Sequence, residues 1–269
     1  MLSGETRLVG LLGHPLSHSL SPRMQNAAFA ARGLDWAYVP LPVEPGRLEP
    51  AIAGLVALGF VGANVTIPHK TSVVAFCDEL DGVAERAGSV NTLVVEDGRV
   101  LGSSTDGAAV VEQVDAAGAR VLVLGAGGAA QAVATALVDA GCASLGVAAR
   151  DPERAHALAS RLLSLCPEHD VSGEDAWPPD AAGAGLVVNA TPLTDELLVV
   201  PERGQAVVDL AYTADGSATA LVATARERGC DVVDGLDVLV AQGAASFERW
   251  TGIAAPVEVM RAAVRSLRP

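Results

Sequence analysis

The chain has 269 residues, half of them hydrophobic, which is enough for two modest domains or one large one with a sizeable core. Its formal net charge of -14 argues against nucleic acid as a partner, because phosphate contacts need clustered Lys and Arg. No apolar stretch approaches the ~18 residues needed to cross a bilayer, and the apolar run near the N-terminus is too short for a signal peptide. We therefore expect a cytoplasmic protein with no membrane partner. Its four cysteines lack the spacing of a zinc site or a redox dithiol, so we expect reduced thiols and no metal.

The first hundred residues alternate between strand and helix patterns. The patterns predict strands at 7–13, 36–41, 62–68 and 89–95, and helices from 22 to about 33, at 48–59 and at about 71–80. Ser21 precedes Pro22, a combination typical of an N-cap followed by a first-turn proline. Asp97-Gly98 lies between two apolar pairs and predicts a hairpin turn.

A second alternation begins at Ala119. It predicts strands at 120–125, 144–150, 186–191 and 206–211, and helices within 125–141, at 153–165 and at 218–229. Residues 167–185 are rich in Pro, Gly and acids and indicate a loop-rich connection, whereas 238–267 indicate mainly helix. Only 3% of the residues are aromatic, and the small residues in their place favour helices packed closely on a parallel sheet, that is, an α/β protein.

The strongest local signal is G-x-G-x-x-A at Gly125, Gly127 and Ala130, directly after an apolar strand and before a helix. Gly125 permits a tight turn, and Gly127 lets the backbone approach a pyrophosphate without a Cβ in the way. Ala130 lets the helix pack close to the strand, and the helix N-terminus offers N–H groups to the phosphates. A bare glycine-rich turn is the alternative, but the strand and the helix on either side favour dinucleotide binding.

The end of the next strand carries opposed signals about which dinucleotide would bind. Arg150 is placed to pair with a 2′-phosphate, helped by Arg154, whereas Asp151 is placed to accept a hydrogen bond from a free 2′-hydroxyl. A third interpretation is that Asp151 caps a helix beginning at Pro152 and faces away from the ribose.

Lys70 and Asp106 are ambiguous when each is taken alone. A lysine at a strand-to-helix junction is usually solvated, and an aspartate in S-T-D-G is a good helix N-cap. Their interpretation depends on a series of motifs: GHPLSHSLSP at 13–22, NVTIPHK at 64–70, GSVNTL at 88–93, STDG at 104–107, GAGGAAQA at 125–132, NAT at 189–191, DLAY at 209–212 and the stretch 235–252. In order and spacing these resemble the shikimate dehydrogenase family over essentially the full chain.

The resemblance implies the reversible, NADP-dependent reduction of 3-dehydroshikimate to shikimate in aromatic amino acid (chorismate) biosynthesis. Oxidation of a secondary alcohol removes a proton from oxygen and a hydride from carbon, and Lys70 with Asp106 would be the acid–base pair. The implied substrate-binding residues are Ser19, Ser21, Asn64, Thr66, Asn91, Tyr212 and Gln242. The implied cofactor-binding residues are Gly125, Ala126, Gly127, Gly128, Ala129, Arg150, Asp151, Arg154, Asn189, Thr191 and Gly235.

The resemblance also implies an α/β fold of two domains with the active site in the cleft between them. The α/β substrate-binding domain would span 1–105, completed by C-terminal helices at 236–269, and a Rossmann dinucleotide-binding domain would span 106–235. As a monomer or a homodimer, the protein would take shikimate or 3-dehydroshikimate as its small-molecule partner.

The sequence departs from the family pattern at several positions. Ser104 replaces an asparagine, the loop around Thr194 lacks a glycine, and the segment after Tyr212 lacks a proline and is about two residues longer. The family's Asn-Arg-Thr phosphate clamp appears as Ala149-Arg150-Asp151, so NAD is the alternative to the expected NADP. The rival functions are an NAD-dependent quinate/shikimate dehydrogenase and a non-catalytic ligand sensor on the same fold. Retention of the catalytic pair argues against the sensor.

Overall fold

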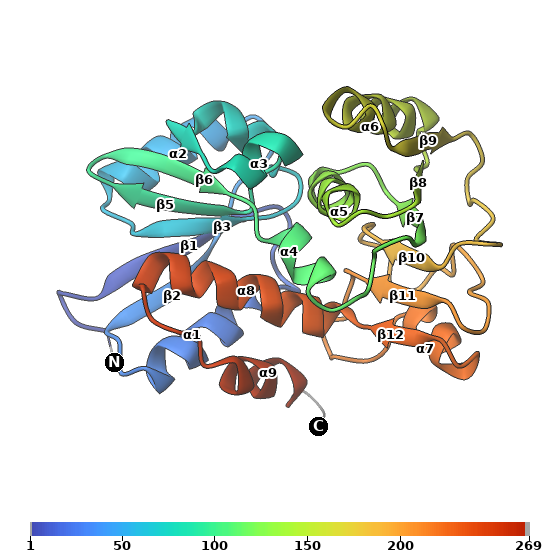
Figure 1. The fold of residues 1–269 in the computed structure, drawn as a ribbon. Helices are drawn as coiled ribbons and strands as arrows, with labels where there is room; N and C mark the ends of the chain where they lie inside the picture. The colour runs from blue at the N-terminus through green and yellow to red at the C-terminus, as the bar shows by residue number, and fades with distance from the viewer. Residues whose placement is uncertain (1, 267–269) are drawn as a thin grey trace. The chain divides into compact units, whose positions relative to one another are not determined.

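A computed structural model describes residues 2–266 of the chain. The chain divides into two units, one of residues 1–105 with 239–269 and the other of residues 106–238. Each unit is built on a six-stranded sheet (Figure 1). No helix among the described residues combines the length and the hydropathy needed to cross a membrane.

The sheet of the first unit is mixed, with strand order β2-β1-β3-β5-β6-β4. Its strands are β1 (Arg7–Gly13), β2 (Trp36–Pro42), β3 (Gly62–Val65), β4 (Glu79–Leu80), β5 (Thr92–Glu96) and β6 (Arg99–Ser103). β1 runs parallel to β2 and β3, whereas β5 is antiparallel to both β3 and β6. The last five residues of β1 are all buried, because this strand lies between β2 and β3 in a sheet covered on both faces.

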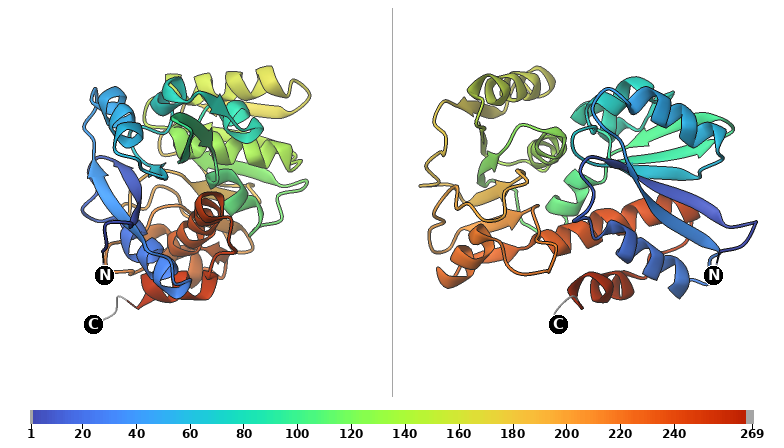
Figure 2. Two further views of the ribbon diagram at one scale, coloured as in Figure 1. Left: turned by 90° about the vertical axis from the view of Figure 1, so that its left-hand side faces the viewer. Right: turned by 180° about the vertical axis from the view of Figure 1, so that it is seen from behind.

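The helices of this unit cover both faces of its sheet. They are α1 (Ser21–Ala31), α2 (Leu48–Ala57), the 3₁₀ helix η1 (Ser72–Phe76), α3 (Gly82–Ala87), most of α8 (Gly235–Thr251) and α9 (Val257–Arg265). On one face, α2 packs Ile52 and Leu55 into a core with Leu12 and Leu93. On the other face, Trp250 of α8 donates a hydrogen bond to the Leu93 carbonyl oxygen at 2.9 Å. Figures 1 and 2 both show α9 beside α1.

The sheet of the second unit is entirely parallel, with strand order β12-β11-β10-β7-β8-β9. Its strands are β7 (Arg120–Leu124), β8 (Ser144–Ala148), β9 (Asp170–Glu174), β10 (Leu186–Asn189), β11 (Ala206–Asp209) and β12 (Asp231–Val233), and its helices are α4 (Asp106–Val111), α5 (Gly128–Asp139), α6 (Pro152–Leu165) and α7 (Ala220–Glu227). This is the doubly wound order of a Rossmann fold, in which ligands bind beyond the carboxyl ends of the strands, where the strand order reverses. That point lies between β7 and β10, so the chemistry of this unit is expected in the loops that follow them.

Most predicted elements are confirmed, including the two-residue hairpin between β5 and β6. Asp97 and Gly98 both have positive φ, at 51° and 78°, as a type I′ turn requires. The predicted helix at 71–80 is wrong, because the chain leaves η1 at Cys77 in extended conformation and pairs with β6 instead. The Asp78 amide donates to the Val100 carbonyl oxygen at 2.8 Å, and the Asp78 carboxylate accepts from the Val100 amide at 2.7 Å.

Three further features differ from the prediction. β9 lies inside the segment expected to be loop-rich, and α3, α4 and β12 had no clear sequence signal. Ser21 is not the N-cap of α1: Leu20 holds that position, with φ -89° and ψ -7°, and no side chain caps the helix. The Ser19 amide donates to the Leu16 carbonyl oxygen in the turn before α1, and the helix begins at Ser21, one residue earlier than predicted. Leu267, the end of the predicted helical tail, lies outside the described residues.

Candidate active-site residues in the two units

Ser19 and Thr66 lie on two loops that leave neighbouring parallel strands of the first unit, and Ser21 begins α1 where the first of these loops ends. The loop after β1 is fixed to the loop after β3 by a 2.9 Å hydrogen bond from the His14 amide to the Ile67 carbonyl oxygen. Gly13 packs so closely on Thr66 that an added Cβ would collide with the Thr66 methyl group. The Ser21 amide donates to the Ser19 hydroxyl oxygen at 3.3 Å. These contacts gather three hydroxyl side chains at one end of the sheet, where they can donate hydrogen bonds to a carboxylate with no added charge.

Asn91 is the centre of a buried network that includes Gln242. Its Nδ2 donates to the Thr105 hydroxyl at 2.8 Å and to Oε1 of Gln242 at 3.4 Å. Its Oδ1 accepts from the Thr105 amide at 2.9 Å, and the Thr105 hydroxyl donates to the Gln242 carbonyl oxygen at 3.1 Å. Two predicted ring-hydroxyl ligands are therefore neighbours, held by a threonine that sequence reasoning did not single out.

Asn64 is surrounded by protein partners. Its Oδ1 accepts from the Tyr38 hydroxyl at 2.8 Å, and its Nδ2 donates to the Asn91 carbonyl oxygen at 3.0 Å and to the Ser246 hydroxyl at 2.9 Å. The side chain thereby joins β2, β3 and α8 beneath the Asn91 network. Tyr38 and Ser246 were not predicted as site residues, since they are 26 and 182 positions away from Asn64 in the sequence.

Lys70 follows β3 on a tightly held turn. Its carbonyl oxygen accepts from the Val90 amide at 2.8 Å, which fixes the lysine backbone next to the segment that carries Asn91. The preceding His69 is buried, with Nε2 2.6 Å from the Val43 carbonyl oxygen. Lys70 is half-buried.

Asp106 is the first residue of α4 and directly follows Thr105 of the network. Only 5% of it is exposed. The next residue, Gly107, is packed so tightly that an added Cβ would be 2.7 Å from the Ala132 carbonyl oxygen of α5. Asp106 and Lys70 belong to different units, and their pairing stays a prediction.

The glycine-rich turn of the second unit has the geometry that its motif predicts. Gly125 has φ +111°, and an added Cβ would be 3.1 Å from the Ala190 carbonyl oxygen, so this position requires glycine. Gly127 is extended and precedes the first residue of α5, and nothing lies within 4 Å of a Cβ added there. Gly128 and Ala129 follow in the first turn, partly exposed, whereas Ala126 is buried. Open space at the N-terminus of a twelve-residue helix suits a pyrophosphate.

Arg150, Asp151 and Arg154 lie at the end of β8 and the start of α6. The Asp151 carboxylate caps α6 by accepting from the Glu153 amide at 3.1 Å, which confirms the predicted helix cap; its orientation toward the ribose stays a prediction. Arg154 extends back toward the glycine-rich turn, with Nη2 3.5 Å from the Ala126 carbonyl oxygen. Arg150, the residue before Asp151, is exposed.

Asn189, at the end of β10, shares a buried network with Asp209, at the end of β11. The Asn189 Nδ2 donates to Asp209 at 2.9 Å, and its Oδ1 accepts from the Thr191 amide at 3.0 Å and hydroxyl at 2.7 Å. Burial raises the pKa of Asp209 to about 6. Gly235, the first residue of α8, packs so closely on Ala211 that an added Cβ would collide with its carbonyl oxygen.

The loop after β11 carries Tyr212, which is half-buried. Asn189, Thr191, Tyr212 and Gly235 were all predicted site residues, but Asp209 was not. The available signal was an acid at the end of an apolar strand that the sequence predicts to be buried.

Two other features lie apart from these residues. Among residues 2–266, one group of side chains could hold a metal ion: Cys166, Glu168 and His169, whose ligand atoms lie within 4.8 Å of one another. They follow the C-terminus of α6, about 20 Å from the N-cap at the usual rise of about 1.5 Å per residue, and so lie far from the arginines.

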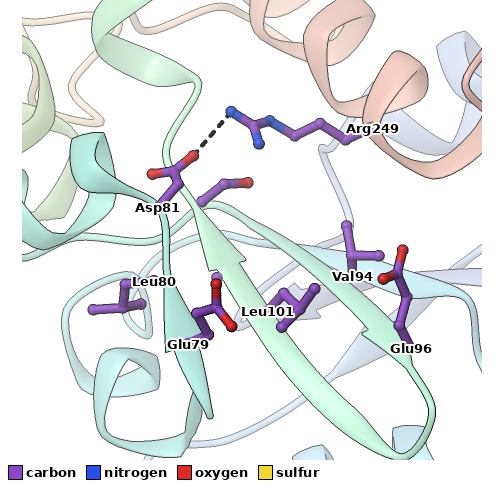
Figure 3. Close-up of a pocket in the computed structure, with 9 residues that line it drawn as sticks. Glu79, Leu80, Asp81, Val94, Glu96, Leu101 and Arg249 are labelled. Carbon is purple, nitrogen blue, oxygen red and sulfur yellow. Dashed lines mark ion pairs between the residues drawn. The ribbon is translucent and has the colours of Figure 1, made fainter.

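The second feature is a pocket on the β4–β6 side of the first unit (Figure 3). Its volume of about 230 Å³ is small for a ligand site, and an ion pair of 2.9 Å between Asp81 and Arg249 crosses its rim. Glu79 and Glu96 also line it, which makes it unsuited to an anionic substrate. None of the predicted site residues lines this pocket.

Three family models match the chain. The shikimate dehydrogenase substrate binding domain matches residues 11–93, the shikimate / quinate 5-dehydrogenase model matches 108–170, and the shikimate 5′-dehydrogenase C-terminal domain matches 235–265. A shikimate dehydrogenase (NADP+) of Moorella thermoacetica is 46% identical over 280 residues, which cover 98% of this chain and 94% of the relative.

Solved structures agree with these matches. A shikimate dehydrogenase in complex with NADP+ superposes with a TM-score of 0.88 at 37% identity, over 99% of this chain and 97% of its own. A quinate dehydrogenase of Corynebacterium glutamicum in complex with NAD has a TM-score of 0.82 at 31% identity, over 97% of this chain and 99% of its own. Near-complete coverage at these identities extends to both units and to every motif described above. The chain therefore belongs to the shikimate dehydrogenase family.

Proposed function

We propose that the chain catalyses the reversible, NADP-dependent reduction of 3-dehydroshikimate to shikimate in the biosynthesis of chorismate and the aromatic amino acids. The observation that carries the proposal is the Asn91–Thr105–Gln242 network, which holds two ring-hydroxyl ligands together and directly precedes Asp106 in the chain. The second unit supplies the glycine-rich turn and the arginines that a phosphorylated dinucleotide requires.

The proposed chemistry divides the alcohol's two hydrogens between the protein and the cofactor. In the oxidation direction, Lys70 and Asp106 hold the reacting hydroxyl and take its proton, while Asn91 and Gln242 orient the ring through its other hydroxyls. Ser19, Ser21, Thr66 and Tyr212 bind the carboxylate through hydroxyl donors. NADP+, when bound, accepts the hydride that leaves the same carbon.

The residues of the second unit fit the cofactor. The open space at Gly127 leaves room for the pyrophosphate at the N-terminus of α5. Arg150 and Arg154 offer guanidinium groups for the 2′-phosphate, and the cap on α6 directs the Asp151 carboxylate to the Glu153 amide. We expect Arg150→Ala to abolish the preference for NADP+ over NAD+, measured as a ratio of kcat/KM values. A native preference for NAD+ would contradict this and favour the quinate-type rival.

Substitution of the catalytic pair tests the assignment of chemistry. Lys70→Ala and Asp106→Ala should each lower kcat by about 10²–10⁴-fold, with a much smaller change in NADPH affinity. Arg99→Ala removes an exposed cation of the same unit, which pairs with Glu79 at 3.2 Å, and should leave kcat unchanged. Turnover within a few-fold of wild type in Lys70→Ala would rule out its catalytic role. Shikimate binding with no turnover in the wild type would favour the ligand sensor.

The cytoplasm is the proposed location, because the four cysteines are free thiols, which suits a reducing compartment. One chain carries both sets of proposed residues, so a monomer suffices for activity and a homodimer is compatible with it. Size-exclusion chromatography with light scattering at the assay concentration distinguishes these two states.

A further inference from the structure

We propose that Asp209 is a positioning residue, which holds the loops after β10 and β11 in the conformation that receives the nicotinamide end of the cofactor. The inference rests on the proposed function. Arg150, beside β8, marks the adenosine side of the parallel sheet. The loops after β10 and β11 lie on the other side of the point where the strand order reverses, and so belong to the second half of the dinucleotide.

The Asp209 carboxylate accepts hydrogen bonds from three different segments. The Asn189 side-chain amide and the Ala211 backbone amide each donate to Oδ1 at 2.9 Å, and the Thr219 hydroxyl donates to Oδ2 at 2.5 Å. Asp209 itself is 0% exposed. A single carboxylate therefore joins the end of β10, the loop after β11 and the start of α7.

Each of the three hydrogen-bond partners of Asp209 is itself connected to a proposed site residue or to the loop that carries one. Asn189 in turn holds Thr191, because its Oδ1 accepts hydrogen bonds from the Thr191 amide and hydroxyl. Ala211 lies against Gly235 on one side and is followed by Tyr212 on the other. Thr219 precedes Ala220, whose amide donates to the Thr194 carbonyl oxygen at 2.8 Å and so holds the first part of the loop after β10. The carboxylate thus determines the shape of both loops without reaching the ligand itself.

The hydrogen bonds of the network favour the ionised carboxylate, whereas burial favours the neutral form and outweighs them in the pKa. Both groups that reach Oδ1 are N–H donors, so a proton on Asp209 must lie on Oδ2 and be donated to the Thr219 hydroxyl oxygen. That oxygen already accepts from the Val222 amide at 3.2 Å as the N-cap of α7, so protonation turns its hydroxyl hydrogen away from Asp209.

Burial and a neighbouring carboxylate bring the titration of Asp209 into the pH range of a binding assay. Burial is the main cause that raises the pKa of Asp209 to about 6, and Asp234 adds to it. Asp234 is paired with Arg226 of α7 at 2.9 Å, which limits its repulsion of Asp209. We therefore expect the loops to loosen as the pH falls through about 6.

The test compares NADPH binding, followed by its fluorescence, in the wild type and Asp209→Asn between pH 5 and pH 8. Asparagine keeps an acceptor for Asn189 and Ala211 and donates to Thr219, so it reproduces the protonated state. We expect the variant to bind about tenfold more weakly at pH 8 and equally well at pH 5. The ratio of the two dissociation constants cancels the titration of the ligand's own 2′-phosphate. Asp215→Asn removes an exposed carboxylate on the loop that follows β11 and should give a ratio near one at both pH values.

Substitutions at Thr219 provide an independent measurement should Asp209→Asn fold poorly. Thr219→Val removes the donor to Oδ2, so the midpoint of the pH dependence should move upward, whereas Thr219→Ser keeps both the donor and the helix cap and should leave it in place. A lower Tm in Asp209→Asn with an affinity ratio independent of pH would show a merely structural role and overturn the proposal. A wild-type chain that binds NADPH but does not oxidise shikimate would contradict the proposed function alone. A chain that binds neither NADPH nor NADH would contradict both.

Discussion

Replacement of Asn64 by alanine tests whether this side chain stabilises the first unit or binds the substrate. The substitution removes the hydrogen bond from the Tyr38 hydroxyl and the two N–H donors of Nδ2, which reach the Asn91 carbonyl oxygen, the Ser246 hydroxyl and, at 3.2 Å, the Thr92 hydroxyl. At about 1 kcal/mol for each net hydrogen bond, we expect the free energy of unfolding to fall by about 3 kcal/mol. A change of that size corresponds to about 6–12 °C in Tm for a domain of moderate length.

A double-mutant cycle with Tyr38→Phe isolates the bond from the Tyr38 hydroxyl. Tyr38→Phe alone should lower the free energy of unfolding by about 1 kcal/mol. The double variant should lower it by about 1 kcal/mol less than the sum of the two single variants, because both of these remove the same hydrogen bond. Chemical unfolding followed by circular dichroism gives the free energies, and shikimate KM is measured in parallel. Asn64→Ala with stability within about 1 kcal/mol of wild type and a strongly raised KM would refute the structural assignment and make Asn64 a substrate ligand.

Three further outcomes follow from the geometry. Ser21→Ala should raise shikimate KM and leave Tm unchanged, because the Ser21 side chain does not cap α1; a lower Tm with an unchanged KM would contradict its substrate role. Gly127→Ala should fold normally and weaken NADPH binding at least about tenfold. Gly125→Ala should weaken binding and also lower Tm, because φ +111° is strained for alanine. Thermal melts measure the effect on Tm, and binding titrations measure the effect on affinity. Asp209 has a folded-state pKa of about 6 against 3.8 for an unperturbed aspartate, so its contribution to stability is present below about pH 4 and is lost as the pH rises through 6. Relative to Asp209→Asn, the free energy of unfolding of the wild type should fall by roughly 3 kcal/mol across that window, and an unchanged difference would contradict the raised pKa.

The elements that could be predicted are those with strong local signals. β1 and β7 are short apolar runs, the hairpin after β5 has an Asp-Gly turn, and α6 begins at Asp151-Pro152. The error at 71–80 arose from a tertiary effect, because this segment pairs with β6 rather than completing a helix. A short edge strand of two residues carries no periodicity that the sequence could reveal.

In the site, too, the residues that could be predicted are those whose role depends on neighbouring residues in the sequence. The glycine-rich turn could be predicted because strand, turn and helix lie next to one another in the sequence. Lys70 and Asp106 required the whole series of motifs. Tyr38, Ser246 and Asp209 were missed because their roles depend on hydrogen bonds to residues 20 to 182 positions away, which no single segment encodes.

The most direct test of the proposed function is kcat/KM of the wild-type protein for shikimate and for quinate, each with NADP+ and with NAD+. Formation of reduced cofactor is followed by its absorbance, with all four combinations measured at the same pH and ionic strength. We expect the highest kcat/KM for shikimate with NADP+, and a large loss when either partner is exchanged. A higher value for quinate with NAD+, or no turnover of shikimate with either cofactor, would contradict the account.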